Sequence, residues 1–190
     1  DVERSRGLGD VYKRQVFYLF VTTMALYAVE SFGASDTVGG FASSAFVLGA
    51  TCMRVFSGWI VDRVGHKKAA LTSLAFVTLV AVAYFFAHNV AVLIIVRMVH
   101  GAAYALTSTA LMAVAQSVIP HERRAEGTGY FALGTTLATA FGPAIGLLLA
   151  NNIGYTTLFA VALGANIVSL ILALVLRYPA EVSSEKPAFS

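Results

Sequence analysis

Long apolar stretches dominate this sequence and restrict the folds that it can adopt. Stretches of about 20 apolar residues, the length at which a helix spans the hydrocarbon core of a bilayer, recur along the chain with short polar segments between them. Of the 190 residues, 58% are hydrophobic and 12% are charged, whereas soluble domains carry about 25% charged residues. The sequence therefore predicts an all-α polytopic membrane protein whose helices cross the lipid bilayer.

Six membrane helices account for the apolar stretches. We expect them at residues 16–32, 38–61, 69–87, 90–119, 127–149 and 156–176. The first stretch is slightly short for a full span, and Ser35 or Asp36 can cap the helix that follows it. The second helix of each group of three is rich in small residues, so the six helices fit an inverted 3+3 repeat. Residues 16–178 would form this single membrane domain.

The basic residues indicate how the helices are oriented. Seven of them fall on one side of the predicted bundle: Arg63, Lys67, Lys68, Arg123, Arg124, Arg177 and Lys186. The loops at 33–37, 88–89 and 150–155 contain neither Lys nor Arg. Because cytoplasmic loops carry the excess of Lys and Arg, we expect both termini on the cytoplasmic side of a bacterial inner membrane. The net charge of +3 does not indicate nucleic-acid binding, since the basic residues lie in separate short loops.

The two ends of the chain differ from the membrane domain. Residues 1–15 are polar, show no apolar periodicity and include no initiating Met. Residues 9–15 resemble a translated sequencing adapter, so we expect residues 1–15 to be a non-native leader. A basic cytoplasmic leader is the alternative, and it fits the same orientation. Residues 179–190 would begin a cytoplasmic linker or tail.

A short charged hairpin joins the second and third predicted helices. Asp62 falls at the C-terminal end of its helix, where an anion is unfavourable, so a cation or the N-terminus of another helix should compensate it. Gly58, one turn earlier on the same face, would let another backbone approach closely, and Gly65 permits a tight turn. The positive charge of the loop comes from Arg63, Lys67 and Lys68. A loop that only fixes the orientation of the helices is the alternative.

A basic residue, Arg97, lies well inside the fourth predicted helix, about seven residues or roughly 10 Å from its outer end. An Arg that faces lipid costs several kcal/mol, so we expect Arg97 to face a cavity or a partner. His100 and Tyr104 follow on the same face. Together the three residues could bind an anionic group or relay a proton. An Arg that snorkels to the outer headgroups above a core His is the alternative.

Small residues recur every four positions along the fifth predicted helix. This stripe, at which another helix can pack closely, consists of Gly134, Ala138, Gly142 and Gly146. Pro143 removes a backbone donor and should kink or loosen the helix. An ordinary kinked packing helix is the alternative.

The remaining polar residues predict neither a metal site nor an enzyme. Glu30 lies near the outer end of the first helix, where it could pair with Arg97, although a solvated carboxylate at the cavity mouth is the favoured interpretation. Cys52 is the single cysteine and offers neither a disulfide nor a metal-binding set. No span holds a carboxylate pair, a metal-ligand cluster or a G-x-S-x-G turn, so we expect no cofactor.

The charged hairpin closely resembles the loop between helices 2 and 3 of the major facilitator superfamily, which follows the pattern G-x-x-x-D-R-x-G-R/x-K/R-K/R. The residues that match are Gly58, Asp62, Arg63, Gly65, Lys67 and Lys68. The resemblance implies that Asp62 and Gly58 contact a helix of the other half of a transporter and steady one of its two access states. His66 stands where the family prefers Arg, which softens the charge of the loop.

Two further segments resemble patterns of this family. Arg97, His100 and Gly101 match the fourth-helix pattern R-x-x-Q-G, whose Arg is linked to proton coupling or substrate charge. His100 replaces the Gln of that pattern, which alters the usual hydrogen-bond partner and introduces a titrating group.

The fifth helix is similar to the antiporter pattern G-x8-G-x3-G-P-x2-G-G. The matching positions are Gly129, Gly142, Pro143 and Gly146. Ala138 and Leu147 depart from the pattern.

The resemblance covers about residues 16–179 and the amino-terminal six-helix half of such a transporter. It implies secondary active transport of a small solute by alternating access, with export driven by proton influx. Proton-coupled uptake, a non-transporting membrane subunit and an inactive truncated half are the alternatives. Because six helices form half a pathway in this family, the partner would be a missing carboxy-terminal half or a second copy.

Overall fold

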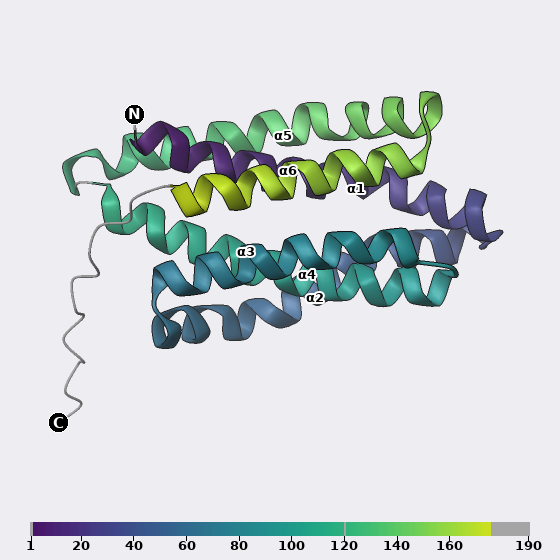
Figure 1. Cartoon of the computed structure of the whole chain (residues 1–190), viewed down its shortest axis with the longest axis horizontal. Helices are drawn as coiled ribbons and strands as arrows, with labels where there is room; N and C mark the ends of the chain where they lie inside the picture. Colours follow the sequence, from purple (N-terminus) through teal and green to yellow (C-terminus); the bar gives the residue numbers. More distant parts are fainter. Residues whose placement is uncertain (1, 120, 176–190) are drawn as a thin grey trace.

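The computed structural model describes residues 2–119 and 121–175, and side chains from Val16 onwards except at positions 118, 121, 124, 130, 131, 134 and 135. The described residues form a bundle of long α-helices with no strands, which confirms the predicted fold class (Figure 1). The helices are α1 (Val2–Phe32), α2 (Asp36–Val64), α3 (His66–Ala83), α4 (Val90–Val118), α5 (Arg124–Asn152) and α6 (Tyr155–Val175). Two short 3-10 helices, η1 (Tyr84–Phe86) and η2 (His121–Arg123), lie in the connections.

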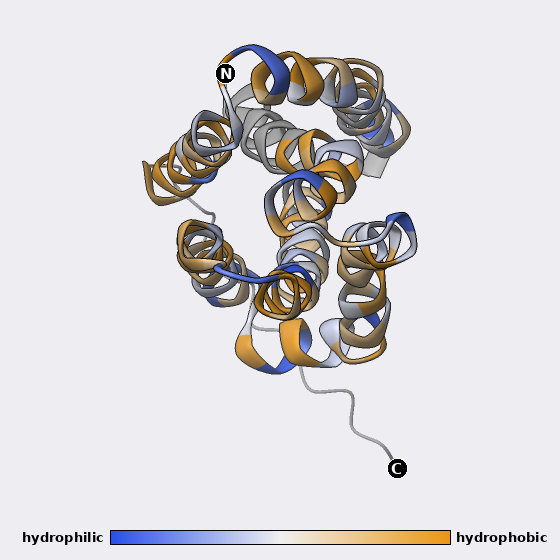
Figure 2. Cartoon of the chain, turned by 90° about the vertical axis from the view of Figure 1, so that its right-hand side faces the viewer, coloured by the Kyte–Doolittle hydropathy of each residue, from blue (hydrophilic) through white to orange (hydrophobic). Residues whose placement is uncertain are grey.

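Four of these helices are long and apolar enough to cross a membrane, judged on the described residues. They span Asp36–Val64, His66–Phe86, Val90–Ser117 and Tyr155–Val175, and Val16–Phe32 is a shorter apolar helix. Large apolar side chains that a soluble protein would bury are exposed, among them Leu79, Phe86, Ile95, Leu174 and Val175. Seen along the helix axes, hydrophobic residues lie on the outer sides of the ribbons as well as between them (Figure 2). These surfaces suit contact with lipid.

Three predicted helix starts were wrong by three residues or more. The first helix begins at Val2 instead of residue 16, because Glu, Arg, Leu, Lys and Gln are good helix formers although they are not all apolar. The third helix begins at His66 and the fifth at Arg124, each three residues before the predicted start. The apolar stretches of the sequence therefore predict the membrane-spanning part of each helix, but they do not predict where the helix begins.

Caps and a glycine turn fix where the helices begin. Ser35, one of the two predicted candidates, caps α2, because its hydroxyl accepts a hydrogen bond of 3.4 Å from the Val38 N–H. Asn89 caps α4 in the same way, accepting from Val92 at 2.9 Å. Gly65 joins α2 to α3 with a φ of 92°, a conformation that residues with a Cβ rarely adopt.

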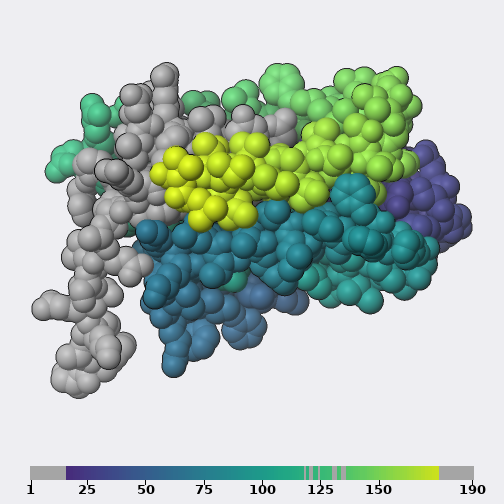
Figure 3. Space-filling view, viewed as in Figure 1, coloured from purple at the N-terminus to yellow at the C-terminus, as the bar shows by residue number. Residues whose placement is uncertain are grey.

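The two groups of three helices are interlocked. α4 packs most extensively on α2 and then on α3, and α1 packs most extensively on α5 and also on α6. The first helix of each group thus lies against the second and third helices of the other, an arrangement consistent with an inverted 3+3 repeat, and α1 also packs on α2 of its own group. α6 also runs alongside α3 (Figure 3). We call the end of the bundle with the turns after α1, α3 and α5 the outer end.

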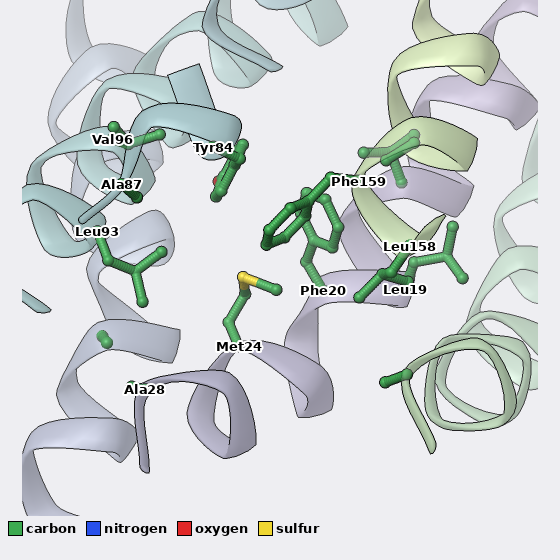
Figure 4. Packing of buried hydrophobic residues seen from close by; sticks show 14 of the residues in the cluster. Leu19, Phe20, Met24, Ala28, Tyr84, Ala87, Leu93, Val96, Leu158 and Phe159 are labelled. Carbon is green, nitrogen blue, oxygen red and sulfur yellow. The ribbon is translucent and has the colours of Figure 1, made fainter. Parts of the chain in front are cut away.

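Aromatic residues fill the outer half of the bundle. Phe20 and Met24 of α1, Tyr84 of η1 and Phe159 of α6 converge in the main hydrophobic cluster (Figure 4). The Tyr84 ring lies 5.0 Å from the Phe20 ring and 5.5 Å from the Phe159 ring, measured between centroids. This cluster connects helices from both groups of three.

Glycines allow the closest helix crossings. A Cβ at Gly49 of α2 would collide with the Met98 carbonyl of α4, and one at Gly101 of α4 would collide with the Phe46 carbonyl of α2. Small residues of this kind let membrane helices pack backbone against backbone. The contact between α2 and α4 therefore depends on both glycines.

We predict that Gly101→Ala destabilises the protein, because the new methyl group must displace the backbone carbonyl of Phe46. Overpacking of this kind costs about 1–3 kcal/mol. The melting temperature of the purified protein in detergent measures the effect. Gly164→Ala is the matched control, since a Cβ there meets nothing within 4 Å. Equal melting temperatures for the two variants would contradict the prediction.

Candidate functional site

Arg97 lies entirely inside the bundle, at the interface of α4 and α2. Its side chain has 0% of its surface exposed. Nη2 donates a hydrogen bond of 2.9 Å to the Ser43 carbonyl, and Nε donates one of 3.4 Å to the Ala42 carbonyl. The guanidinium also lies over the Phe46 ring, 4.9 Å from its centroid. Arg97 thus points into the protein and does not snorkel to the headgroups.

The positive charge of Arg97 lacks a carboxylate partner in the described part of the chain. The ion pairs there join Asp62 to His66 and Arg123 to Glu126, both at the surface. Arg97 Nη1 is buried and has no hydrogen-bond partner among the described residues. A buried cation held by backbone carbonyls and an aromatic ring, without a carboxylate, is costly in a membrane, and ionisable residues that persist there are commonly functional.

Ser43 links this interface to a third helix. Its hydroxyl donates a hydrogen bond of 2.5 Å to the Val21 carbonyl of α1, while its carbonyl accepts from Arg97. One turn of α2 therefore contacts α1 and α4 together.

His100 is buried one turn further along α4. Its Nδ1 lies 2.9 Å from the Tyr84 hydroxyl, within hydrogen-bond distance. The Phe46 ring is 5.3 Å from the imidazole and the Phe20 ring is 6.3 Å away, both nearly perpendicular to it. The imidazole is thus enclosed by aromatic residues of α1, α2 and η1.

The predicted residues of α4 gather around one side chain of α2. Phe46 contacts Arg97 and His100 as described above, and its ring lies 5.3 Å from the Tyr104 ring. Gly101 abuts the backbone of the same residue. The structure therefore brings Arg97, His100, Gly101 and Tyr104 together, with Phe46 at their centre.

Sequence reasoning missed Phe46 and Tyr84. Each is an aromatic residue in an apolar stretch, where packing against a neighbouring helix or lipid is the ordinary expectation. One signal in the sequence could have identified Tyr84. A buried Tyr hydroxyl needs a hydrogen-bond partner, and the fourth helix carries a polar side chain, His100, at the same depth in the membrane. Asn166 of α6 was also missed, and neither polar atom of its buried side chain has a partner in the described part of the chain.

Glu30 belongs to a separate contact at the outer end. It accepts a hydrogen bond of 2.7 Å from the Tyr155 hydroxyl, which joins the end of α1 to the start of α6. Glu30 is exposed, as expected for a carboxylate at the surface. The alternative in which it pairs with Arg97 does not occur in this structure, since no ion pair joins the two.

The charged hairpin lies at the inner end and is open to its surroundings. The Asp62 side chain is 80% exposed, and its carboxylate lies 3.9 Å from His66 Nε2. Arg63 covers the Trp59 ring at 5.3 Å. A Cβ at Gly58 would meet nothing within 4 Å, so no described helix makes the close approach expected there. Lys67 and Lys68 are exposed.

α1 lies on the small-residue stripe of α5. A Cβ at Gly142 would come within 2.5 Å of Tyr18 Cβ, and one at Gly146 within 2.5 Å of the Leu19 carbonyl. Ala138 is buried and Pro143 lies inside the helix. Gly134 lies outside the residues whose packing the structure describes.

The family model of the Major Facilitator Superfamily matches residues 15–190. The chain belongs to this superfamily. An uncharacterized protein of Mycobacterium tuberculosis is 34% identical over 124 residues, which make up 65% of this chain and 29% of that protein. The superfamily assignment agrees with the hairpin motif and with the interlocked groups of three helices.

Two similar proteins are named as exporters. The staphylopine export protein of Staphylococcus aureus is 31% identical over 133 residues, 69% of this chain and 32% of that protein. The tetracenomycin C resistance and export protein of Streptomyces glaucescens is 22% identical over 147 residues, 77% of this chain and 27% of that protein. The matched part of this superfamily member thus spans about a third or less of each relative.

We predict that Arg97→Met leaves the stability of this superfamily member unchanged or raises it. The substitution removes a buried charge with an unpaired nitrogen, and replacing buried ionic groups by apolar ones is often neutral or stabilising by about 1–4 kcal/mol. Thermal unfolding in detergent provides the measurement. Leu93→Ala, in the hydrophobic cluster, should instead cost about 2–5 kcal/mol. A comparable loss of stability in Arg97→Met would show that Arg97 serves the fold.

Proposed function

We propose that this chain is the amino-terminal half of a secondary active transporter that exports a small solute by alternating access, driven by proton influx. The observation that carries the proposal is the buried Arg97, held by carbonyl groups next to His100 and without a carboxylate partner in the described residues. An unpaired buried cation can attract an anionic group, and an imidazole can take up and release a proton. The export proteins among the relatives support the outward direction.

Arg97 and His100 would couple proton movement to solute movement, with Gly101 and Tyr104 shaping the same face of α4. Because Arg97 lies between α4 and α2, a change in its bonding alters how these two helices pack. Packed helices tend to have discrete alternative arrangements. A local change in charge could therefore bias the bundle toward one access state.

The hairpin from Gly58 to Lys68 would stabilise one access state at the cytoplasmic end. Its carboxylate and its open glycine both lie at a surface that no described helix covers. The proposed partner is a carboxy-terminal half or a second copy of the chain, which would complete the pathway. Both termini would lie in the cytoplasm and the helices in a bacterial inner membrane, since the basic loops share the inner end.

Coupling is tested in everted membrane vesicles that contain the complete transporter and a pH-sensitive dye. Drugs, sugars and metal chelators are supplied in turn, and solute-dependent proton release identifies a substrate. We expect Arg97→Met to abolish this release while the protein still inserts and folds. Arg123→Met is the matched control, because its side chain is 70% exposed. Proton-coupled transport that survives in Arg97→Met would remove Arg97 from the mechanism.

Gating is tested with Asp62→Asn, which keeps the size of the side chain and removes its charge. We expect normal insertion and transport slowed about tenfold, the effect of losing an interaction of about 1.4 kcal/mol. Glu122→Gln at another exposed inner position is the control. Initial transport rates are compared at equal protein levels. An unchanged rate for Asp62→Asn would contradict the proposed gating role.

A further inference from the structure

The contact between Tyr84 and His100 connects a residue outside the family motifs to the proposed coupling site. We propose that Tyr84 is a positioning residue that holds the neutral His100 imidazole in the tautomer with its proton on Nε2. This inference rests on the proposed function of His100, although the tautomer can be measured without any transport assay.

The Tyr84 ring is fixed by its neighbours. It is buried at the start of η1, stacked on Phe159 of α6 and packed against Phe20 of α1. Its carbonyl also accepts a hydrogen bond of 3.3 Å from the Ala87 N–H, which closes the turn that leads to α4. The hydroxyl is therefore held at one place by packing on the ring and by the backbone of the turn.

The strengths of the two groups and the burial of the hydroxyl together favour one direction for the hydrogen bond. A phenol O–H is a better donor than an imidazole N–H, and an imidazole nitrogen is a better acceptor than a phenol oxygen. A hydroxyl hydrogen without an acceptor is costly in an apolar environment, and the acceptor that Tyr84 reaches among the described residues is His100 Nδ1, at 2.9 Å. Tyr84 accordingly donates and Nδ1 accepts. A neutral imidazole with Nδ1 as acceptor carries its proton on Nε2.

The aromatic residues around His100 keep the ring from turning over. Phe46, Phe20 and Tyr84 pack against it at interplanar angles of 80°, 75° and 68°. A ring flip would also break the bond to Tyr84. When the imidazole takes up a second proton, the Tyr84 hydroxyl can rotate and accept from Nδ1–H, so Tyr84 keeps its own proton throughout. Tyr84 thus orients His100 and does not itself exchange a proton.

The arrangement departs from the family pattern in a consistent way. Where the pattern has Gln, this chain has His100, whose two ring nitrogens are distinct, and the hydrogen bond that one of them makes sets which one carries the proton. The Tyr84 hydroxyl supplies that hydrogen bond from η1. The Arg97 guanidinium lies over Phe46, whose ring also packs against His100.

The tautomer is measured by nitrogen NMR of the full chain in lipid nanodiscs, with ¹⁵N-labelled histidine. His66, His88 and His121 are replaced by Gln, which leaves His100 as the single imidazole of the four. We expect an unprotonated Nδ1 and a protonated Nε2 in the neutral ring. A neutral ring that carries its proton on Nδ1 would overturn the proposal, and this result needs no variant of Tyr84.

Tyr84→Phe removes the hydroxyl and preserves the ring that packs on Phe20 and Phe159. We expect the ratio of the Nε2–H to the Nδ1–H tautomer to fall about fivefold, as for the loss of one hydrogen bond of ordinary strength. Tyr27→Phe is the control, because Tyr27 belongs to the same aromatic cluster and should leave the ratio unchanged. An unchanged ratio in Tyr84→Phe, or an equal change in both variants, would overturn the positioning role.

The same variants separate this inference from the proposed transport function. In the complete transporter, Tyr84→Phe should alter proton-coupled transport when His100 is present and have no further effect in a His100→Gln background. Additive effects in the double variant would show that Tyr84 acts independently of His100 and would overturn the inference. If the tautomer behaves as expected and no solute-dependent proton movement occurs, the positioning role stands and the proposed function fails.

Discussion

The close crossing of α2 and α4 is the constraint on which the placement of Arg97, and with it the candidate site, depends. A guanidinium in the apolar interior needs hydrogen-bond acceptors, and here the Ser43 and Ala42 carbonyls supply them. These carbonyls are within reach because Gly49 and Gly101 let α2 and α4 approach closely. The hydrogen bonds of Arg97 therefore require the small residues at the crossing, since a wider separation of the two helices would leave the charge without acceptors.

A row of aromatic side chains in contact runs from this site toward the outer end. His100 meets Tyr84, which stacks on Phe159, and Phe159 in turn packs against Tyr27 at 5.2 Å between ring centroids. Tyr27 lies 4.8 Å from Tyr155, whose hydroxyl bonds Glu30. The rings thus form a continuous line of contacts between His100 and the ends of α1 and α6, at the end of the bundle where the proposed pathway opens.

Hydropathy and charge were enough to predict the helices, because the length of a span and the positions of short loops follow from the bilayer itself. They were also enough to predict that Arg97 points away from lipid and that His100 shares its face, and the structure places both side chains inside the bundle. They could not identify Phe46, Tyr84 or the contact of Glu30 with Tyr155, since these depend on how each helix is rotated about its axis. Glu30 and Tyr155 are 125 positions apart, and no local pattern links them. The leading residues also formed a helix that apolarity did not predict.

The interlocked pairing means that the helices meet their partners at different times during synthesis. A chain made from its N-terminus inserts α2 and α3 before α4, so Arg97 enters the membrane with its acceptors already present. α1 meets α2 early, through the bond from Ser43 to the Val21 carbonyl, but its most extensive partner, α5, begins only at Arg124. The side of α1 that later faces α5 would be open to lipid until then. The buried Thr23 hydroxyl of α1 donates to the Leu19 carbonyl of the same helix at 2.6 Å and so needs no acceptor from a later helix, whereas α4, which carries the charge, follows the helices that hold it.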